Sequence, residues 1–300
     1  MQLKIWAAIL LASVAWGTNG VATRAALNDG VPPIAMVAIR AFIATLVLFV
    51  LLRFTGRRVP KDLATWSTGI VQGVFQLSTP FVLFNLAYQN ASAGFVGLLV
   101  ALVPLATAIV AHFLLPDERL HLVKVLSLTV AFVGVGVLLL SGDSGLEEGG
   151  RPLLAAVLAI AAVLSISYAG VYAKSYAENF DPLELTYMQF AIGIVLIGAT
   201  MLIAEGLPGA ISAWGWTLIV YMAIIGSIVP FLTYFWLLQQ VSATKASLVG
   251  YVLPLVSLVA GIVLIDEELQ FGIGVGGLLI LVGVILTDRS ERRLPLAPVR

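Results

Sequence analysis

Ten apolar stretches, each about 20 residues long, follow one another along the chain and are joined by short polar connections. A helix of that length spans the hydrocarbon core of a bilayer, where each backbone group must form its hydrogen bond within its own segment. We therefore predict an all-α integral membrane protein with ten transmembrane helices. The stretches lie near 5–27, 34–53, 66–89, 92–115, 121–140, 153–176, 183–204, 213–238, 244–265 and 270–287.

Charge is too scarce in this chain for the surface of a soluble domain. Only 11% of the 300 residues are charged and 60% are hydrophobic, whereas about a quarter of the residues in a soluble domain are charged. The net charge of zero gives no reason to expect a nucleic-acid partner, and the absence of cysteine excludes disulfides and thiolate metal sites. We expect a small-molecule substrate and the lipid bilayer as partners, with no cofactor and no metal, and we leave the oligomeric state open.

The sequence repeats itself at an offset of 150 residues. Apolar helices match one another by composition alone, so the informative matches are those between rarer residues that share one register. These matches predict a first five-helix repeat at 1–140, a linker at 141–152, a second five-helix repeat at 153–287 and a polar tail at 288–300. The matched residues are Arg24 with Lys174, Pro32 with Pro182, Trp66 with Trp216, Pro80-Phe81 with Pro230-Phe231, Pro104-Leu105 with Pro254-Leu255, and Glu118 with Glu268.

Lysine and arginine are unevenly distributed over the connections, and short cytoplasmic loops carry the excess of these residues. With a cytoplasmic N-terminus, only Arg24 and Arg151 lie outside, and Arg40 lies within a helix. We predict that both termini and the tail are cytoplasmic. Five helices per repeat is an odd number, so the second repeat enters the membrane inverted. The cytoplasmic residues are Lys4, Arg53, Arg57, Arg58, Lys61, Arg119, Lys124, Lys174, Lys245, Arg289, Arg292, Arg293 and Arg300.

Inverted repeats of this kind are typical of secondary transporters. Their substrate sites lie near the bilayer midplane between the repeats, and rocking of one half against the other alternates access. The sequence has no HExxH, no GxSxG and no buried carboxylate pair, so a membrane-embedded enzyme is the less favoured alternative. No acid lies at the centre of a predicted helix, which predicts transport without tight proton coupling.

Several motifs stand out within the repeat: Trp16-Gly17-Thr18-Asn19, Pro80-Phe81 with the turn at 87–94, Pro104, and the acid pairs Asp117-Glu118 and Glu267-Glu268. Together these motifs resemble those of the EamA family of the drug/metabolite transporter superfamily. The resemblance covers essentially the whole chain, and within the family the chain is most similar to the bacterial YddG-type exporters of amino acids. It implies export of aromatic and other neutral amino acids across the inner membrane. It also implies a central cavity walled by helices 1, 3, 4, 6, 8 and 9, with 5 and 10 at the periphery.

Polar and aromatic side chains form stripes at helical spacing on several predicted spans. Polar groups are costly in lipid, so these stripes are expected to face the interior. We predict that they bind substrate; the alternative is that they form interhelical hydrogen bonds and interfacial anchors. The predicted substrate-binding residues are Trp16, Asn19, Gln72, Gln76, Thr79, Tyr168, Tyr172, Ser227, Tyr234 and Tyr251.

Five further residues within the apolar spans are chemically unusual. Pro80, Pro104, Pro230 and Pro254 each remove a backbone donor, and we predict that they form kinks or gate hinges. Arg40 is interpreted as pairing with helix-end carbonyls or with Asp29, with a substrate carboxylate as the alternative. Other solute classes, such as cationic drugs or nucleotide-sugars, remain open, although a single intramembrane arginine disfavours phosphorylated substrates.

Overall fold

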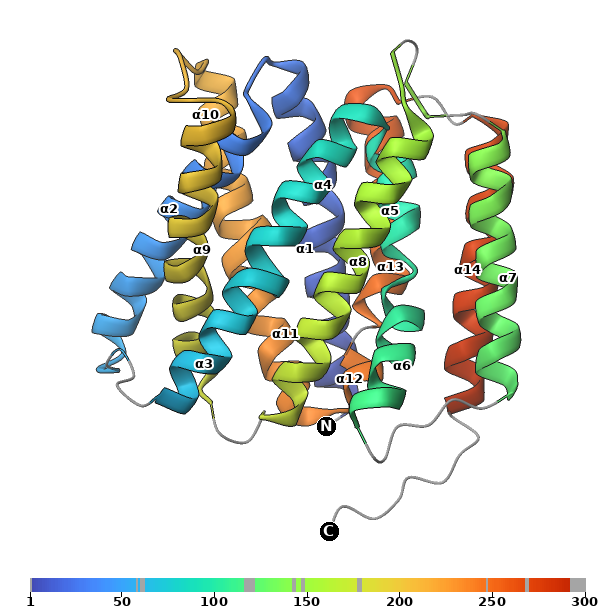
Figure 1. The fold of residues 1–300 in the computed structure, drawn as a ribbon, viewed down its shortest axis with the longest axis horizontal. Coiled ribbons are helices and arrows are strands. Elements are labelled where there is room, and N and C mark those ends of the chain that lie inside the picture. Colours follow the sequence, from blue (N-terminus) through green and yellow to red (C-terminus); the bar gives the residue numbers. More distant parts are fainter. Residues whose placement is uncertain are drawn as a thin grey trace.

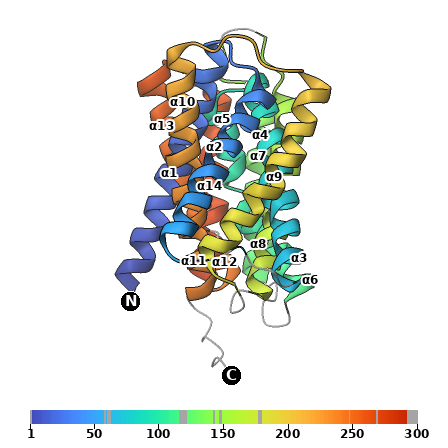
Figure 2. The same cartoon turned by 90° about the vertical axis from the view of Figure 1, so that its left-hand side faces the viewer.

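A computed structural model describes residues 2–57, 59, 63–115, 122–141, 144–146, 149–176, 180–246, 248–267 and 270–291. All regular structure within these ranges is helical, which confirms the predicted all-α class. The helices lie side by side in one elongated bundle (Figures 1 and 2). The start of α1 and the end of α14 lie at the same end of that bundle (Figure 1).

The helices of the structure follow the predicted apolar stretches closely, but several stretches contain more than one element. In the first half they are α1 (Gln2–Asn28), α2 (Pro33–Phe54), α3 (Leu63–Val71), the π-helix η1 (Gln72–Ser78), α4 (Thr79–Asn90), α5 (Ala93–Val100), α6 (Val103–Leu114) and α7 (Leu122–Leu140). In the second half they are α8 (Pro152–Ser175), α9 (Pro182–Ala204), α10 (Ala213–Ala223), the π-helix η3 (Ile224–Ile228), α11 (Val229–Gln240), α12 (Ala243–Ala246), α13 (Val249–Ile265) and α14 (Phe271–Glu291).

Many of these helices are long and apolar enough to cross a membrane. Large apolar side chains are also exposed on the outside of the bundle, among them Phe42, Phe132 and Val195, as suits a surface in contact with lipid. The chain is therefore a multi-pass membrane protein, while the count of ten crossings stays a prediction. The seven qualifying stretches are Leu3–Asn28, Pro33–Phe54, Thr65–Asn90, Ala93–Leu114, Pro152–Ser175, Pro182–Ala204 and Ala213–Gln240; shorter apolar helices are Val125–Leu140, Val252–Ile265 and Phe271–Gly283.

Two of the repeated prolines directly follow a π-helix. Pro80 stands in the first turn of α4 after η1, and Pro230 in the first turn of α11 after η3. Proline cannot donate a backbone hydrogen bond and crowds the preceding turn, so the widened turn rearranges the bonding there. The hydroxyls of Ser78 and Ser227 each donate to the carbonyl five residues earlier, at 2.7 and 2.9 Å.

The other two repeated prolines differ from each other. Pro104 lies in the first turn of α6, just after the irregular residues 101–102, whereas Pro254 lies within the continuous helix α13. Three of the four prolines thus stand where helical geometry changes. Their role as gate hinges stays a prediction.

Helices from the two halves pack against one another throughout the bundle. α1 lies against α13, α6 against α8, and α2 against α9. α7 and α14 pair at one edge of the bundle (Figure 1), where Gly134 and Gly276 allow the backbones to approach. A Cβ at Gly134 would lie 2.7 Å from the Gly276 carbonyl, and a Cβ at Gly276 would lie 2.8 Å from the Gly134 carbonyl. The bundle interior therefore lies between α1–α6 and α8–α13.

Candidate functional site

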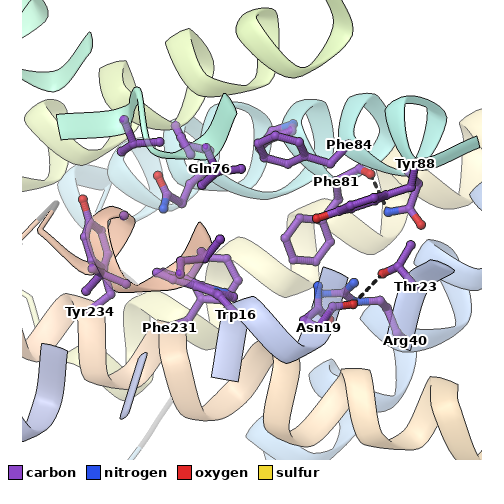
Figure 3. A pocket seen from close by; sticks show the side chains of 18 residues that line it. Trp16, Asn19, Thr23, Arg40, Gln76, Phe81, Phe84, Tyr88, Phe231 and Tyr234 are labelled. Atoms are coloured by element: carbon purple, nitrogen blue, oxygen red, sulfur yellow. Dashed lines mark hydrogen bonds between the residues drawn. The ribbon is translucent and has the colours of Figure 1, made fainter. Parts of the chain in front are cut away.

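A cavity of about 110 Å³ lies inside the bundle, between helices of both halves (Figure 3). This volume is several times the roughly 10–15 Å³ that one buried water requires. Its wall combines a mainly aromatic and aliphatic surface with a few polar groups, as ligand sites usually do. The polar and aromatic lining residues are Trp16, Asn19, Thr23, Arg40, Gln76, Phe81, Phe84, Asn85, Tyr88, Phe231 and Tyr234.

The aromatic wall is built around Phe231 of α11, which is buried. Its ring centroid lies 5.4 Å from Trp16 and 6.0 Å from Phe81, so rings from α1, α4 and α11 meet at one point. Behind it, Phe190 of α9 contacts Phe231 edge-on at 5.5 Å. These pairs stabilise the packing of the two halves and give the cavity a π-rich face.

Arg40 of α2 supplies a cation to the cavity wall. The residue is only 2% exposed. Its Nη2 donates to Ser227 Oγ at 3.0 Å, and its guanidinium carbon lies 4.1 Å from the centroid of the Phe81 ring, a cation–π contact. The Nε donor has no partner within the described part of the chain.

Three side-chain amides also line the cavity, and each has an oxygen without a hydrogen-bond partner among the described residues: Asn19, Gln76 and Asn85. The orientation of Asn85 is set by its Nδ2, which donates to the Phe81 carbonyl at 2.7 Å. Buried carbonyl oxygens without donors are costly. They are therefore suited to accept hydrogen bonds from a bound solute or from water.

The polar groups gather at two sides of the cavity. In Figure 3, Asn19, Thr23, Arg40 and Tyr88 lie on one side, while Gln76 and Tyr234 lie on the other. Phe81, Phe231 and Trp16 lie between them. The arrangement suits a small solute with an apolar middle. Within the described chain, the lining contains no aspartate, glutamate or lysine.

At one end of this cavity, α1 and the loop after α13 are tied to helix ends of the first half. Arg24 donates to the Tyr88 carbonyl at 2.8 Å. The Glu267 carboxyl accepts from the backbone N–H groups of Ala93 and Gly94, at 2.6 and 3.2 Å, at the start of α5. Burial raises the pKa of Glu267 above its ordinary value, although the two N–H donors and the charge of Arg24 act to lower it.

The remaining acids of the two predicted pairs, Asp117, Glu118 and Glu268, lie outside the described residues. The second half has an equivalent of the Arg24 contact 150 residues later: Lys174 donates to the Leu238 carbonyl at 2.8 Å. No group of three or more histidine, aspartate or glutamate side chains in the described ranges is placed to hold a metal ion.

Four of the ten predicted substrate-binding residues line the cavity: Trp16, Asn19, Gln76 and Tyr234. Pro80 also belongs to the lining. Five others do not, and the side chain of Tyr251 lies outside the part of the structure that is described. The five outside the lining are Gln72, Thr79, Tyr168, Tyr172 and Ser227.

The stripe predicted on the third span reaches the cavity only at Gln76. In η1 the hydrogen bonds run to the carbonyl five residues back, so a turn holds more residues than in an α-helix. A residue three positions after Gln76, such as Thr79, is therefore rotated farther from the face of Gln76 than it would be in an α-helix. Gln72 instead donates to the Ala169 carbonyl of α8 at 2.9 Å, while half-buried Thr79 begins α4.

The stripe predicted on α8 packs against the third span and not on the cavity. The Tyr168 ring lies 5.1 Å from that of Phe75, and Tyr172 lies 6.2 Å from Tyr168. The α8 residue that lines the cavity is Ile166. Ser227 lies behind the cavity wall, where it accepts the hydrogen bond from Arg40.

Sequence reasoning missed several lining residues. Arg40 was expected at a substrate only as the alternative; among the described residues it bonds to neither a helix-end carbonyl nor Asp29, and α2, which carries it, was not among the expected cavity walls. Phe84, Asn85 and Tyr88 were also missed. Their spacing from Pro80 is four, five and eight residues, which is the signal of one helical face and could have identified them.

Comparisons with known proteins agree with this architecture. A family model described as the EamA-like transporter family matches residues 3–140 and again residues 153–288. The chain is 23% identical over 294 residues to the uncharacterized transporter YoaV of Bacillus subtilis (strain 168), covering 97% of this chain and 99% of that protein. It is 25% identical over 303 residues to the uncharacterized inner membrane transporter YedA of Escherichia coli (strain K12), covering 99% and 94%.

One solved crystal structure has the same fold. It superposes with a TM-score of 0.70 at 20% sequence identity and covers 95% of this chain and 96% of that chain. An uncharacterized transporter of Archaeoglobus fulgidus is 27% identical over 299 residues, covering 96% of this chain and all of that protein. The similarity extends along the whole chain and includes both halves.

Proposed function

The chain belongs to the EamA-like transporter family, and on that premise we propose that it is a secondary carrier that exports small metabolites across the bacterial inner membrane. The proposed substrates are amino acids with aromatic or other neutral side chains. Transport proceeds by alternating access, with both termini in the cytoplasm.

The cavity carries this proposal. Its lining combines side chains of α1, α2 and α4 with side chains of α8, α11 and α13. Carriers built from inverted repeats bind their substrates between the repeats, so that relative movement of the halves opens the site to one side at a time. The aromatic wall and the unpartnered amide groups suit a solute that has an apolar body and a polar end.

Repeated contacts support the proposed duplication. Arg24 donates to the Tyr88 carbonyl, and Lys174 donates to the Leu238 carbonyl. In each contact the donor and the acceptor are 64 positions apart, and the second contact lies 150 positions after the first. In the proposed topology these contacts lie on opposite sides of the membrane. The charge distribution supports the same topology, since it leaves only Arg24 and Arg151 in outer connections.

Two alternatives within transport are less favoured. A carrier for cationic drugs would gain from a carboxylate in its cavity, and a carrier for nucleotide-sugars would gain from several cations. The described lining has one arginine and no carboxylate. For the same reason we propose facilitated or exchange transport without tight proton coupling.

Counterflow in proteoliposomes tests the proposal. Proteoliposomes that contain the purified carrier are preloaded with one unlabelled member of a panel of neutral amino acids and organic cations, and uptake of the same labelled solute from outside is followed. We expect exchange with aromatic or other neutral amino acids. Failure of every amino acid in the panel would contradict the proposed substrates, and uphill uptake driven by a pH gradient alone would contradict the proposed coupling.

A variant pair connects this flux to the cavity. Trp16→Ala removes part of the aromatic wall, so we expect lower flux at normal expression. Trp214→Ala is the matched control, because Trp214 on α10 is 57% exposed and lies outside the cavity lining. Equal flux in both variants would remove Trp16 from the site.

A further inference from the structure

Arg40 carries a charge in the bundle interior that its described neighbours do not balance. The residue is buried, and neither its own hydrogen bond nor the cavity lining supplies a described carboxylate. A buried charge is costly unless it is paired and hydrogen-bonded. Its contacts are with the neutral hydroxyl of Ser227 and the ring of Phe81.

Most of the donor capacity of this guanidinium is unused by the described protein. A guanidinium offers five N–H donors in a planar fork that matches a carboxylate. Only the Nη2 contact to Ser227 is made within the described chain, and Nε has no partner there. Arg40 also belongs to the cavity lining, so a solute in the cavity is adjacent to it.

The equivalent position in the second half shows that the fold does not need a cation here. At the repeat offset of 150 residues, Phe190 is the equivalent of Arg40 and Phe231 is the equivalent of Phe81. Arg40 covers the ring of Phe81, and Phe190 packs edge-on against the ring of Phe231 at 5.5 Å. A large apolar side chain therefore fills this position in one half, and the charge in the other half requires a different explanation.

We propose that Arg40 binds the carboxylate of the carried solute, so that the cavity selects organic carboxylates with an aromatic or apolar body. The guanidinium pairs with the carboxylate, and the rings of Trp16, Phe81 and Phe231 contact the body. Ser227 is a positioning residue, because its hydroxyl holds Nη2 and is itself fixed by the Met222 carbonyl. The assignment rests on the proposed carrier function and specifies which chemical group its site requires.

Three analogues of one shape separate the carboxylate from the rest of the solute. 3-Phenylpropionate carries the acid alone, 3-phenylpropionamide replaces the acid by a neutral group, and phenethylamine carries a cation. Phenylalanine completes the panel. We expect the acid and phenylalanine to exchange in counterflow and to raise the unfolding midpoint of the detergent-purified protein. The amide and the amine are expected to do neither.

Variants of Arg40 then assign the preference to this side chain. Arg40→Met keeps an unbranched apolar side chain and removes the guanidinium with its charge, so we expect the KM for the acid to rise by about 10- to 100-fold. The ratio of acid to amide transport is expected to fall to about one, which loss of folding alone would not produce. Arg53→Met is the matched control: it removes an exposed arginine in the last turn of the same helix, outside the cavity lining, and the ratio should not change.

The two proposals fail in different ways. Exchange of the amide or the amine as readily as the acid would overturn the role of Arg40 and leave the carrier function intact. Unchanged acid-to-amide selectivity in Arg40→Met would do the same. Absence of flux for every solute would contradict the carrier function; the thermal measurement still tests Arg40, and absence of stabilisation by either carboxylate would overturn its role.

Discussion

The two halves of the bundle share their framework contacts but not their cavity residues. At the ends of the helices, a cation of the first helix in each half donates to a carbonyl near the end of the third span, Arg24 to Tyr88 and Lys174 to Leu238, both at 2.8 Å. Serine caps recur as well: Ser92 accepts from the N–H of Phe95, and the corresponding Ser242 accepts from that of Lys245. These contacts hold the same helix junctions in both halves.

Inside the cavity the same offset joins unlike residues. Asn19 of α1 corresponds to Ala169 of α8, and Gln76 of η1 corresponds to Gly226 of η3. Both bulky amides thus belong to the first half, and small residues stand at the equivalent positions of the second half. Arg40 and Phe190 also differ. The comparison teaches that the framework accepts unlike residues at these positions, so they are not fixed by the packing that the two halves share.

The largest expected effect comes from filling the space at Gly226. A Cβ there would overlap Asn19 Oδ1 and lie 2.8 Å from its Cγ. Overpacking of this kind costs about 1–3 kcal/mol, so Gly226→Ala should lower the unfolding free energy by that amount in detergent. Asn19→Ala in the same chain should restore most of the loss, because alanine stands at the equivalent position 169. Full stability of Gly226→Ala alone would show that this contact is not constrained.

The paired cations give the next largest effect. Each donates a hydrogen bond to a carbonyl near a helix C-terminus, where a partly buried cation contributes up to about 2 kcal/mol. Arg24→Met and Lys174→Met should each lower the unfolding midpoint. Arg24→Lys and Lys174→Arg should change the unfolding midpoint little, because each substitution introduces the residue type that makes the same contact at the equivalent position of the other half. A large loss in either exchange would show that the two junctions are not equivalent.

The serine caps give the smallest effect, and the cap of the first half is buried whereas that of the second half is exposed. Ser92 is buried and holds Phe95 N at 3.0 Å, whereas Ser242 is exposed and holds Lys245 N at 3.2 Å. Ser92→Ala should cost about 1 kcal/mol, the typical value for a lost N-cap. Ser242→Ala should cost less, because water replaces the lost hydroxyl. Thermal unfolding of the two variants side by side checks the order, and a larger loss at Ser242 would reverse the interpretation.

The positions of the helices could be predicted because the start and the length of an apolar stretch can be read directly along the sequence. The cavity stripe on α1 was also predictable: Trp16, Asn19 and Thr23 are spaced for one face of a regular α-helix, and all three line the cavity. Where the helix is not regular, the same rule fails. The π-turn of η1 could not be inferred from the proline alone, and it rotates Thr79 away from the face of Gln76.

A second feature that the sequence did not predict is which side of a regular helix faces the cavity. The polar stripe on α8 was read as facing the cavity, but Tyr168 faces Phe75 on a neighbouring span. The depth of Arg40 could be counted along α2, yet its partner Ser227 lies 187 positions away. Contacts at that separation depend on how the helices pack, and no periodicity within one helix contains that information.

The glycine contact between α7 and α14 has a genetic consequence. The carbonyl of each glycine occupies the space that a side chain on the other would need. A substitution at Gly134 therefore cannot be compensated by shrinking residue 276, because glycine has nothing left to remove. We expect second-site suppressors of such a mutation to arise elsewhere or not at all, so that recovery of function requires reversion of the original codon.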